Sequence, residues 1–189
     1  MSVNTKEDKQ IILTKNFFER DTVKVAKDLL GAVLVRKING KAYKGIIVET
    51  EAYKQNDPAC HAFKGRTKRA MTLFKEPGLS YVYMIYGMYY CLNIVTEPVD
   101  TAGAVLIRAI EPLCECLETN GPGKLCKALK VTKLDNEIDV CNFDSSICVF
   151  EGKKIPSSNI VKTSRIGIKQ AANYPWRFYI KDNIFVSKK

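Results

Sequence analysis

The chain has 189 residues, of which 46% are hydrophobic and 26% charged, and its 30 Lys and Arg against 20 Asp and Glu give a formal net charge of +10. This length and composition predict one domain with an ordinary hydrophobic core, and they exclude an intrinsically disordered chain and a disulfide-stapled miniprotein. The positive excess favours a polyanionic partner, most often nucleic acid, although Lys-rich surfaces also serve solubility alone.

The sequence predicts neither a membrane protein nor a secreted one. No run of 18 apolar residues occurs, and the first ten residues, MSVNTKEDKQ, are polar where a signal peptide needs an apolar segment. We therefore expect an intracellular protein without a membrane partner. Seven cysteines, an odd number with no C-x-x-C pair, indicate reduced thiols. No metal site is expected from them.

The first elements in chain order are a polar arm and a helix. Residues 1–15 are mostly polar and form the arm. Asp21 is a favourable helix N-cap, and the apolar residues after it lie on one helical face as far as Leu30. Gly31 then supplies the usual stop at a helix C-terminus. The sequence thus predicts a helix between Asp21 and Leu30.

A hairpin follows this helix. Two segments rich in β-formers, 32–37 and 42–53, flank the dipeptide Asn39-Gly40. Both central residues of a type I′ turn need positive φ, which Asn and Gly tolerate best. This is the strongest hairpin signal in the chain.

The remaining pattern predicts a mostly antiparallel sheet with few helices. The expected elements are a basic loop at 64–69, a second hairpin over 80–96 turning at Gly87-Met88, a strand over 102–110, helical segments within 112–130, and a last short hairpin over 176–187 turning at Asp182-Asn183. The fold class is therefore α+β: a single mixed domain over 16–189, with a curved, mostly antiparallel β-sheet, packed helices and a protruding β-hairpin.

Two carboxylates lie close together in the strand predicted at 42–53. Strict alternation places Ile47, Glu49, Glu51 and Tyr53 on one face of that strand. Residues two apart on a strand are roughly 6.6 Å apart, so the two carboxylates are near enough to share acid and base work. A solvent-facing polar edge is the alternative interpretation.

Other chemistry-bearing motifs are few. His61 is the only histidine, so it is either a structural group or the one residue of its kind in a site, and it cannot form a histidine metal cluster. The segment GPGKLCKAL at 121–129 lacks the first glycine and the Ser or Thr of a phosphate-binding loop, so no nucleotide cofactor is expected. Lys124 at a helix N-terminus still suits contact with a backbone phosphate.

Tyrosines are concentrated in one place. Five of the nine fall between residues 81 and 90. Packing across strands explains some of them, whereas a large aromatic residue at a tight turn cannot be buried by that turn. In a basic protein, the tip formed by Tyr86, Met88 and Tyr89 suits insertion between base pairs.

Taken together, these motifs resemble a known family, the alkyladenine (3-methyladenine) DNA glycosylases of base excision repair. The resemblance runs from about Asp21 to the C-terminus, and the family fold agrees with the α+β prediction. It rests on VETEAY at 48–53, HAFKGRTKR at 61–69, YVYMIYGMYYCLNIV at 81–95, VLIRAIEP at 105–112, GPGKLCKAL at 121–129, RIG at 165–167 and RFYI at 177–180.

The resemblance implies a role for each matching residue. Glu51 corresponds to the general base that activates water against C1′ of a flipped nucleotide, Arg108 to the arginine that orients this water and a phosphate, and the Ile166 carbonyl to a third contact of the water. The aromatic walls of the base pocket are implied to be Tyr53, His61 and Tyr83, with Asn93 crowding the exocyclic group of guanine. The implied DNA contacts are Tyr86, which intercalates, together with Met88, Tyr89, Arg66, Arg69 and Lys124.

The implied activity is monofunctional hydrolysis of the N-glycosidic bond of damaged purines: the alkylated bases 3-methyladenine and 7-methylguanine, and the deaminated base hypoxanthine. Alkylation makes the base cationic, which weakens its bond and attracts it to aromatic rings by about 0.5–2 kcal/mol each. No lysine lies among the catalytic motifs, so no lyase step is expected. The implied partner is damaged duplex DNA in the nucleoid or nucleus, bound by a monomer that needs neither cofactor nor metal.

One departure and two rival functions accompany this resemblance. Family members show a proline and an asparagine within the stretch that is Thr67-Lys68-Arg69-Ala70 here. A glycan hydrolase using Glu49 and Glu51 as a carboxylate pair is the first rival, and a net charge of +10 suits a neutral sugar poorly. The second rival is a non-catalytic nucleic-acid binder whose tyrosines stack on bases.

Overall fold

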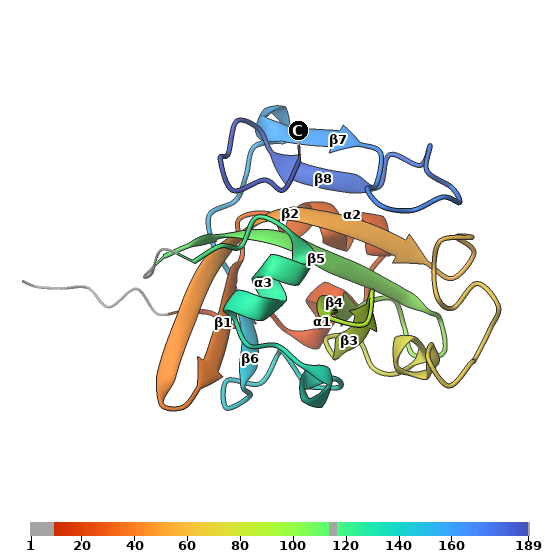
Figure 1. Ribbon diagram of the computed structural model, residues 1–189, viewed down its shortest axis with the longest axis horizontal. Helices are drawn as coiled ribbons and strands as arrows, with labels where there is room; N and C mark the ends of the chain where they lie inside the picture. The colour runs from red at the N-terminus through yellow and green to blue at the C-terminus, as the bar shows by residue number, and fades with distance from the viewer. Residues whose placement is uncertain (1–9, 114–116, 189) are drawn as a thin grey trace, which may run out of the picture.

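The computed structural model describes residues 10–113 and 117–188 and confirms the α+β class: a single domain built on a curved antiparallel sheet (Figure 1). The helices are α1 (Lys15–Phe18), α2 (Thr22–Asp28) and α3 (Pro122–Ala128); the strands are β1 (Val33–Ile38), β2 (Lys41–Lys54), β3 (Ser80–Ile85), β4 (Tyr89–Val95), β5 (Gly103–Pro112), β6 (Ile147–Phe150), β7 (Ile160–Thr163) and β8 (Arg177–Ile180); 3-10 turns lie at Met71–Phe74, Lys133–Asp135 and Ser157–Asn159.

The long strand β2 organises the sheet. The main path runs β3-β4-β5-β2-β1-β6, and β8 pairs with both β2 and β7. One end of β2 therefore pairs with β1, and the other lies between β5 and β8. In Figure 1, β7 and β8 lie on one side of β2 and β5, and β3 and β4 lie on the other. The α2 helix packs against β2 and β5, and α3 packs against β4 and β5.

The first predicted helix and hairpin are confirmed. The Asp21 carboxylate accepts hydrogen bonds from the backbone N–H groups of Val23 and Lys24 at 3.0 Å, which caps α2. The helix ends at Asp28, two residues earlier than predicted. Asn39 and Gly40 both have positive φ, 50° and 72°, and join β1 to β2 as a type I′ turn requires.

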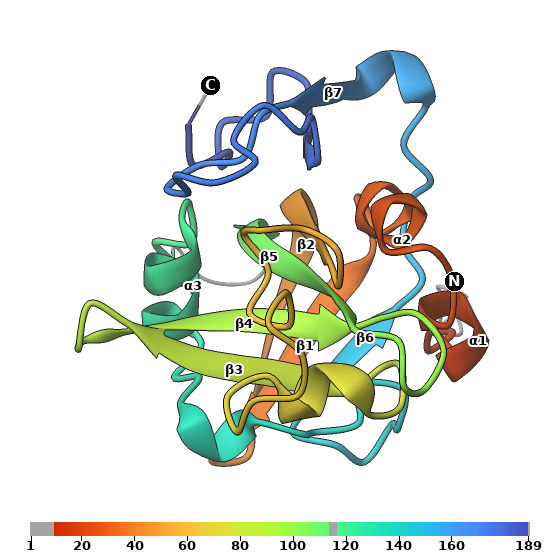
Figure 2. The same cartoon turned by 90° about the vertical axis from the view of Figure 1, so that its right-hand side faces the viewer.

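The turn between β3 and β4 is one residue earlier than predicted. Tyr86 and Gly87, with φ of 52° and 69°, are its central residues, and the Met88 N–H donates to the Ile85 carbonyl at 3.2 Å. Figure 2 shows this turn at the edge of the molecule. A tyrosine therefore occupies a left-handed conformation that favours glycine or asparagine.

The prediction of a last hairpin is wrong, and two other segments, the helical region and the N-terminal arm, differ in extent from what was expected. The helix within 112–130 is confined to α3, because β5 continues to Pro112 and Pro122 stands at the helix N-terminus; residues 114–116 lie outside the described chain. The last hairpin does not form, since β8 pairs with β7 and β2 instead. From Ile11 onward the arm expected over 1–15 is held against β6, where Leu13 donates to the Val149 carbonyl and is buried.

Candidate active site

The pairing of β2 with β5 brings Glu51 close to Arg108. The register shifts between Ile47 and Thr50, so that Arg108 has no strand partner. This irregularity interrupts the regular pairing of β2 with β5, as β-bulges do. Glu49 and Glu51 both contact the Arg108 guanidinium, in line with the common face predicted for them. The alternative interpretation, a solvent-facing polar edge, is wrong, because Glu49 and Glu51 are both fully buried.

Three donors surround the Glu51 carboxylate. The Tyr53 hydroxyl donates to Oε2 at 2.7 Å, and the Ile166 backbone N–H donates to Oε1 at 2.8 Å. Arg108 Nη1 lies 3.2 Å from the same Oε1. The structure therefore assembles Glu51, Arg108, Ile166 and Tyr53 in direct contact. The contact from Ile166 is its amide, and the role implied for its carbonyl stays a prediction.

A small aromatic cavity lies beside these groups. Its walls include all four predicted pocket residues, and Tyr53 belongs both to this cavity and to the contacts of Glu51. The full lining is Tyr53, Ala59, Cys60, His61, Leu73, Tyr81, Tyr83, Asn93 and Ala104. His61 meets the Tyr83 ring edge-on, with ring centroids 4.6 Å apart. Asn93 is held by its Nδ2, which donates to the Tyr81 carbonyl at 3.0 Å.

His61 is held in one tautomer by Tyr81. The Tyr81 hydroxyl donates to the Arg69 carbonyl at 3.1 Å, so it accepts from Nδ1 of His61, which lies 2.8 Å away. The proton is therefore on Nδ1, and Nε2 is left as an acceptor. Burial, together with the charge of Arg69, lowers the pKa of His61 to about 4, which makes the ring neutral near pH 7.

The other polar walls of the cavity are neutral as well. Burial raises the pKa of the Cys60 thiol to about 11 and that of Tyr81 to about 12. Burial also raises the pKa of Tyr83, and burial and the Glu51 carboxylate together raise that of Tyr53. Near pH 7 these phenols and this thiol are therefore protonated, and the cavity is lined by uncharged rings.

Guanidinium groups stack on two of these rings. Arg165 lies with its Cζ 4.6 Å from the centre of the Tyr53 ring, and Arg69 lies 5.3 Å from that of Tyr83. Arg66, the other arginine of the basic loop, pairs with Asp100 at 2.5 Å and is exposed. The two arginines of the basic loop therefore have different surroundings: Arg66 lies at the surface, whereas Arg69 stacks on a ring that lines the cavity.

The turn between β3 and β4 presents its large side chains to solvent. Tyr86 is 82% exposed, Met88 67% and Tyr89 41%. Tyr89 packs on the start of α3, where a Cβ added to Gly123 would come within 3.0 Å of its ring. Lys124, the next residue, pairs with Glu118 at 2.7 Å on the surface. The predicted wedge residues and Lys124 thus lie in one region of the molecule.

Sequence reasoning missed a buried ion pair behind this site. Arg165 pairs through both terminal nitrogens with Asp57, and both side chains are fully buried. Arg165 also donates to the Ala52 carbonyl at 2.9 Å. This pair fixes the loop that carries Ile166. The motif RIG contains Arg165, but nothing in its spacing pointed to Asp57, which is 108 residues away.

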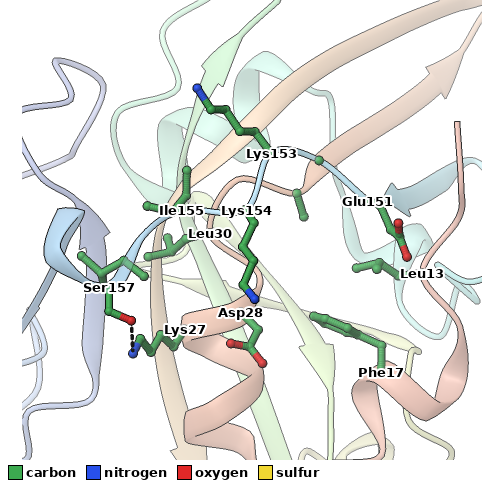
Figure 3. A pocket seen from close by; sticks show the side chains of 13 residues that line it. Leu13, Phe17, Lys27, Asp28, Leu30, Glu151, Lys153, Lys154, Ile155 and Ser157 are labelled. Carbon is green, nitrogen blue, oxygen red and sulfur yellow. Dashed lines mark hydrogen bonds between the residues drawn. The ribbon is translucent and has the colours of Figure 1, made fainter. Parts of the chain in front are cut away.

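The described part of the chain has another cavity, which none of the predicted site residues lines. This separate cavity of about 390 Å³ lies between α2 and residues 151–157, and Figure 3 shows Lys27, Lys153 and Lys154 at its rim. Within residues 10–113 and 117–188, no group of three potential metal ligands occurs, and no helix is long and apolar enough to cross a membrane.

Comparison with known proteins defines the class. A sequence model described as methylpurine-DNA glycosylase (MPG) matches residues 16–184, which include every candidate site residue. The chain is therefore a DNA glycosylase, an enzyme class of DNA repair. It belongs to the methylpurine-DNA glycosylase family, as the sequence motifs predicted.

Individual relatives are similar in sequence to this protein over nearly its whole length. Three proteins with the curated name "Putative 3-methyladenine DNA glycosylase" are similar to it. The one from Francisella tularensis subsp. tularensis (strain WY96-3418) is 48% identical, covering 89% of this chain and 94% of the relative. The one from Clostridium perfringens (strain 13 / Type A) is 47% identical, with 94% and 99% covered. That from Carboxydothermus hydrogenoformans is 44% identical, with 95% and 100% covered.

Proposed function

We propose that this protein hydrolyses the N-glycosidic bond of alkylated purines in duplex DNA by means of a water molecule activated by Glu51. The single observation that carries the proposal is the Glu51 carboxylate, buried beside an aromatic cavity and contacted by Arg108, Tyr53 and the Ile166 amide. A carboxylate accepts a proton from water as the water attacks C1′, and Arg108 can orient that water and the flanking phosphate. The product is an abasic site.

The target base must leave the duplex to reach this carboxylate. We propose that Tyr86 enters the base stack and fills the space that the flipped nucleotide vacates. Its support is the exposure of Tyr86 and Met88 at a tight turn, where neither contributes to the core. Arg66, Arg69 and Lys124 would contact phosphates, which adds the salt-dependent part of the affinity.

The neutral cavity supports a preference for bases whose bond is already weak. A cationic 3-methyladenine or 7-methylguanine meets no opposing charge from His61, which is neutral near pH 7. The cation–π attraction expected from bare rings is reduced at Tyr53 and Tyr83, because each already has a guanidinium on its ring. Selectivity for cationic purines then rests chiefly on their weak glycosidic bond. Hypoxanthine is neutral and lacks this weakening, so it is expected to be released more slowly than either methylated base.

The test is the release of free base from methylated duplex DNA. Wild-type protein is expected to free 3-methyladenine, whereas Glu51→Gln should lower the single-turnover rate by about 10²–10⁴-fold while still binding lesion DNA. Salt-sensitive DNA binding without base release by the wild type would favour the non-catalytic binder. A Glu51→Gln variant that excises at the wild-type rate would remove Glu51 as the base.

The rival glycan hydrolase is disfavoured by the engagement of its second carboxylate. Glu49 accepts four hydrogen bonds, from Arg108, from Arg177 and from both the hydroxyl and the backbone N–H of Ser187, so both of its oxygens are already engaged by donors. A glycosidase of that type needs one free carboxylic acid as well as the carboxylate. Activity on DNA and none on oligosaccharides is therefore expected.

We also propose a monofunctional enzyme that acts as a monomer without a nucleotide cofactor. A lyase step proceeds through a Schiff base on an amine. The groups that contact Glu51 are a guanidinium, a phenol and a backbone amide, none of which forms one. Borohydride should therefore trap no covalent complex with abasic DNA. Sedimentation of the free protein and of its 1:1 DNA complex checks the monomer.

A further inference from the structure

The second carboxylate of β2 has a complete set of partners. Glu49 Oε1 accepts from Arg108 Nε at 3.0 Å, from Arg177 Nε at 2.8 Å and from the Ser187 hydroxyl at 3.0 Å. Its Oε2 accepts from the Ser187 backbone N–H at 2.7 Å. A buried carboxylate with four donors is held in a single orientation. Glu49 can therefore serve as a fixed reference point for the groups that bind it.

Arg108 joins this point to Glu51. Its Nε is bound by Glu49, its Nη1 lies 3.2 Å from Glu51 Oε1, and its Nη2 donates to the Ser187 hydroxyl at 3.2 Å. A guanidinium is a rigid planar fork, so contacts at three of its nitrogens determine both its position and its plane. Without Glu49 and Ser187, Glu51 itself would be the only one of these anchors left to Arg108 among the residues that the structure describes.

The charges of the cluster balance. Two carboxylates, Glu49 and Glu51, face two guanidiniums, Arg108 and Arg177, so the four charges sum to zero. Burial opposes the charge of Arg108, but the carboxylates of Glu51 and Glu49 outweigh it and raise its pKa. Removing either carboxylate would leave two guanidiniums facing a single carboxylate, and this excess positive charge would be buried away from solvent.

We propose that Glu49 and Ser187 are positioning residues for the reaction at Glu51: they clamp Arg108 so that its Nη1 faces the Glu51 carboxylate. The inference rests on the proposed function, because it concerns the same reaction. Neither residue is expected to touch the nucleotide. Both act through Arg108, and Glu49 shares none of the work of the base.

The end of the chain thereby completes the site. Ser187 is 138 residues from Glu49, and Val186 next to it is buried. Arg177 also donates to the Lys188 carbonyl, so β8 and the C-terminal tail hold one another while both bind Glu49. Since β8 pairs with β2 at Glu49 and Glu51, the tail is supported directly beside the carboxylates.

The test compares Glu49→Gln with a matched break of another buried ion pair, Asp135→Asn. Asp135 binds Arg36 at 2.7 Å with both side chains buried, and its contacts include none of the residues around Glu51. Single-turnover base release at saturating enzyme and the dissociation constant for lesion DNA are measured for each. Glu49→Gln should slow release about tenfold or more with less than a twofold change in affinity, whereas Asp135→Asn should lower only the thermal midpoint.

A double-mutant cycle then tests the route through Arg108. In an Arg108→Gln background, Glu49→Gln should cause no further loss of rate, because its target is gone. Ser187→Ala should slow release about threefold, and Ser187→Thr, which keeps the hydroxyl, should restore it. Additive losses, or equal rates in Ala and Thr variants, would overturn the clamp.

These outcomes are separable from failure of the proposed function. If the wild type frees no base, the proposed function is wrong, and the clamp is overturned with it because there is no reaction for it to support. If the wild type frees base and Glu49→Gln does so at the same rate, the function stands and the clamp is refuted.

Discussion

The Tyr53 hydroxyl donates a hydrogen bond to Glu51 Oε2 at 2.7 Å from two residues further along the same strand. One residue thus lines the aromatic cavity with its ring and orients the buried carboxylate with its hydroxyl. The proposed recognition of the base and the proposed activation of water are therefore coupled through a single side chain. That coupling can be separated experimentally, because phenylalanine keeps the ring and removes the donor.

Tyr53→Phe should slow base release about tenfold while leaving the affinity for lesion DNA nearly unchanged. A hydrogen bond to a charged group contributes about 1.5–3 kcal/mol, and part of this is recovered when another donor replaces it. Single-turnover rates and binding titrations check this expectation, with Tyr43→Phe on the β1–β2 hairpin as the control. A loss of affinity equal to the loss of rate would show that the hydroxyl acts in binding instead.

Tyr86→Asn should lower excision from duplex DNA about tenfold without destabilising the fold. Asn tolerates the positive φ of 52° at this position better than Tyr, so the free energy of unfolding should stay the same or rise slightly. Excision of a mispaired lesion, which leaves the stack more easily, should fall less. Phe143→Asn, at another exposed aromatic residue, is the control. Equal excision of paired lesions by the variant and the wild type would contradict the wedge role.

The His61 pKa predicts a pH dependence of stability. Its value is lowered to about 4 in the folded protein, against 6.5 for the free side chain. Between these values the unfolded chain binds more protons, so the free energy of unfolding falls as the pH drops from 6.5 to 4. His61→Asn cannot titrate and should show a shallower fall over this window in urea unfolding. Identical slopes for the two proteins would mean that His61 is not buried as a neutral ring.

Asp57→Asn should destabilise the protein by about 3 kcal/mol, because it leaves Arg165 buried without its counter-charge. It should also slow base release, since Arg165 precedes Ile166 in the loop that contacts Glu51. The exposed pair of Arg20 and Asp28 supplies the control, and Asp28→Asn should cost less than 1 kcal/mol. Urea unfolding measures both variants; a similar cost for the two would refute the structural role of the Asp57 pair.

Local signals account for the parts of the fold that were predicted correctly. The Asn39-Gly40 turn and the Asp21 cap each depend on residues within a few positions, and both are present in the structure. The prediction of a last hairpin was wrong because β8 pairs with strands that are distant in the sequence. Asp182 does have the positive φ of 58° that suits a turn, but β8 pairs with β7 and β2 and not with the residues that follow it.

The candidate site also combines features that local sequence motifs predict with contacts between residues far apart in the sequence. The sequence by itself determined the family and the α+β class, and it singled out Glu51 and four of the residues that line the aromatic cavity, because these are carried by motifs of consecutive or alternating residues. Only the tertiary structure decided how they meet: Ile166 reaches Glu51 across 115 residues and Ser187 reaches Glu49 across 138. Such contacts depend on β8 pairing with β2 and on an irregular register at Arg108, and neither leaves a periodic pattern in the chain. The role of Glu49 was open in the sequence for that reason, since the role proposed for it depends on partners that only folding brings to it.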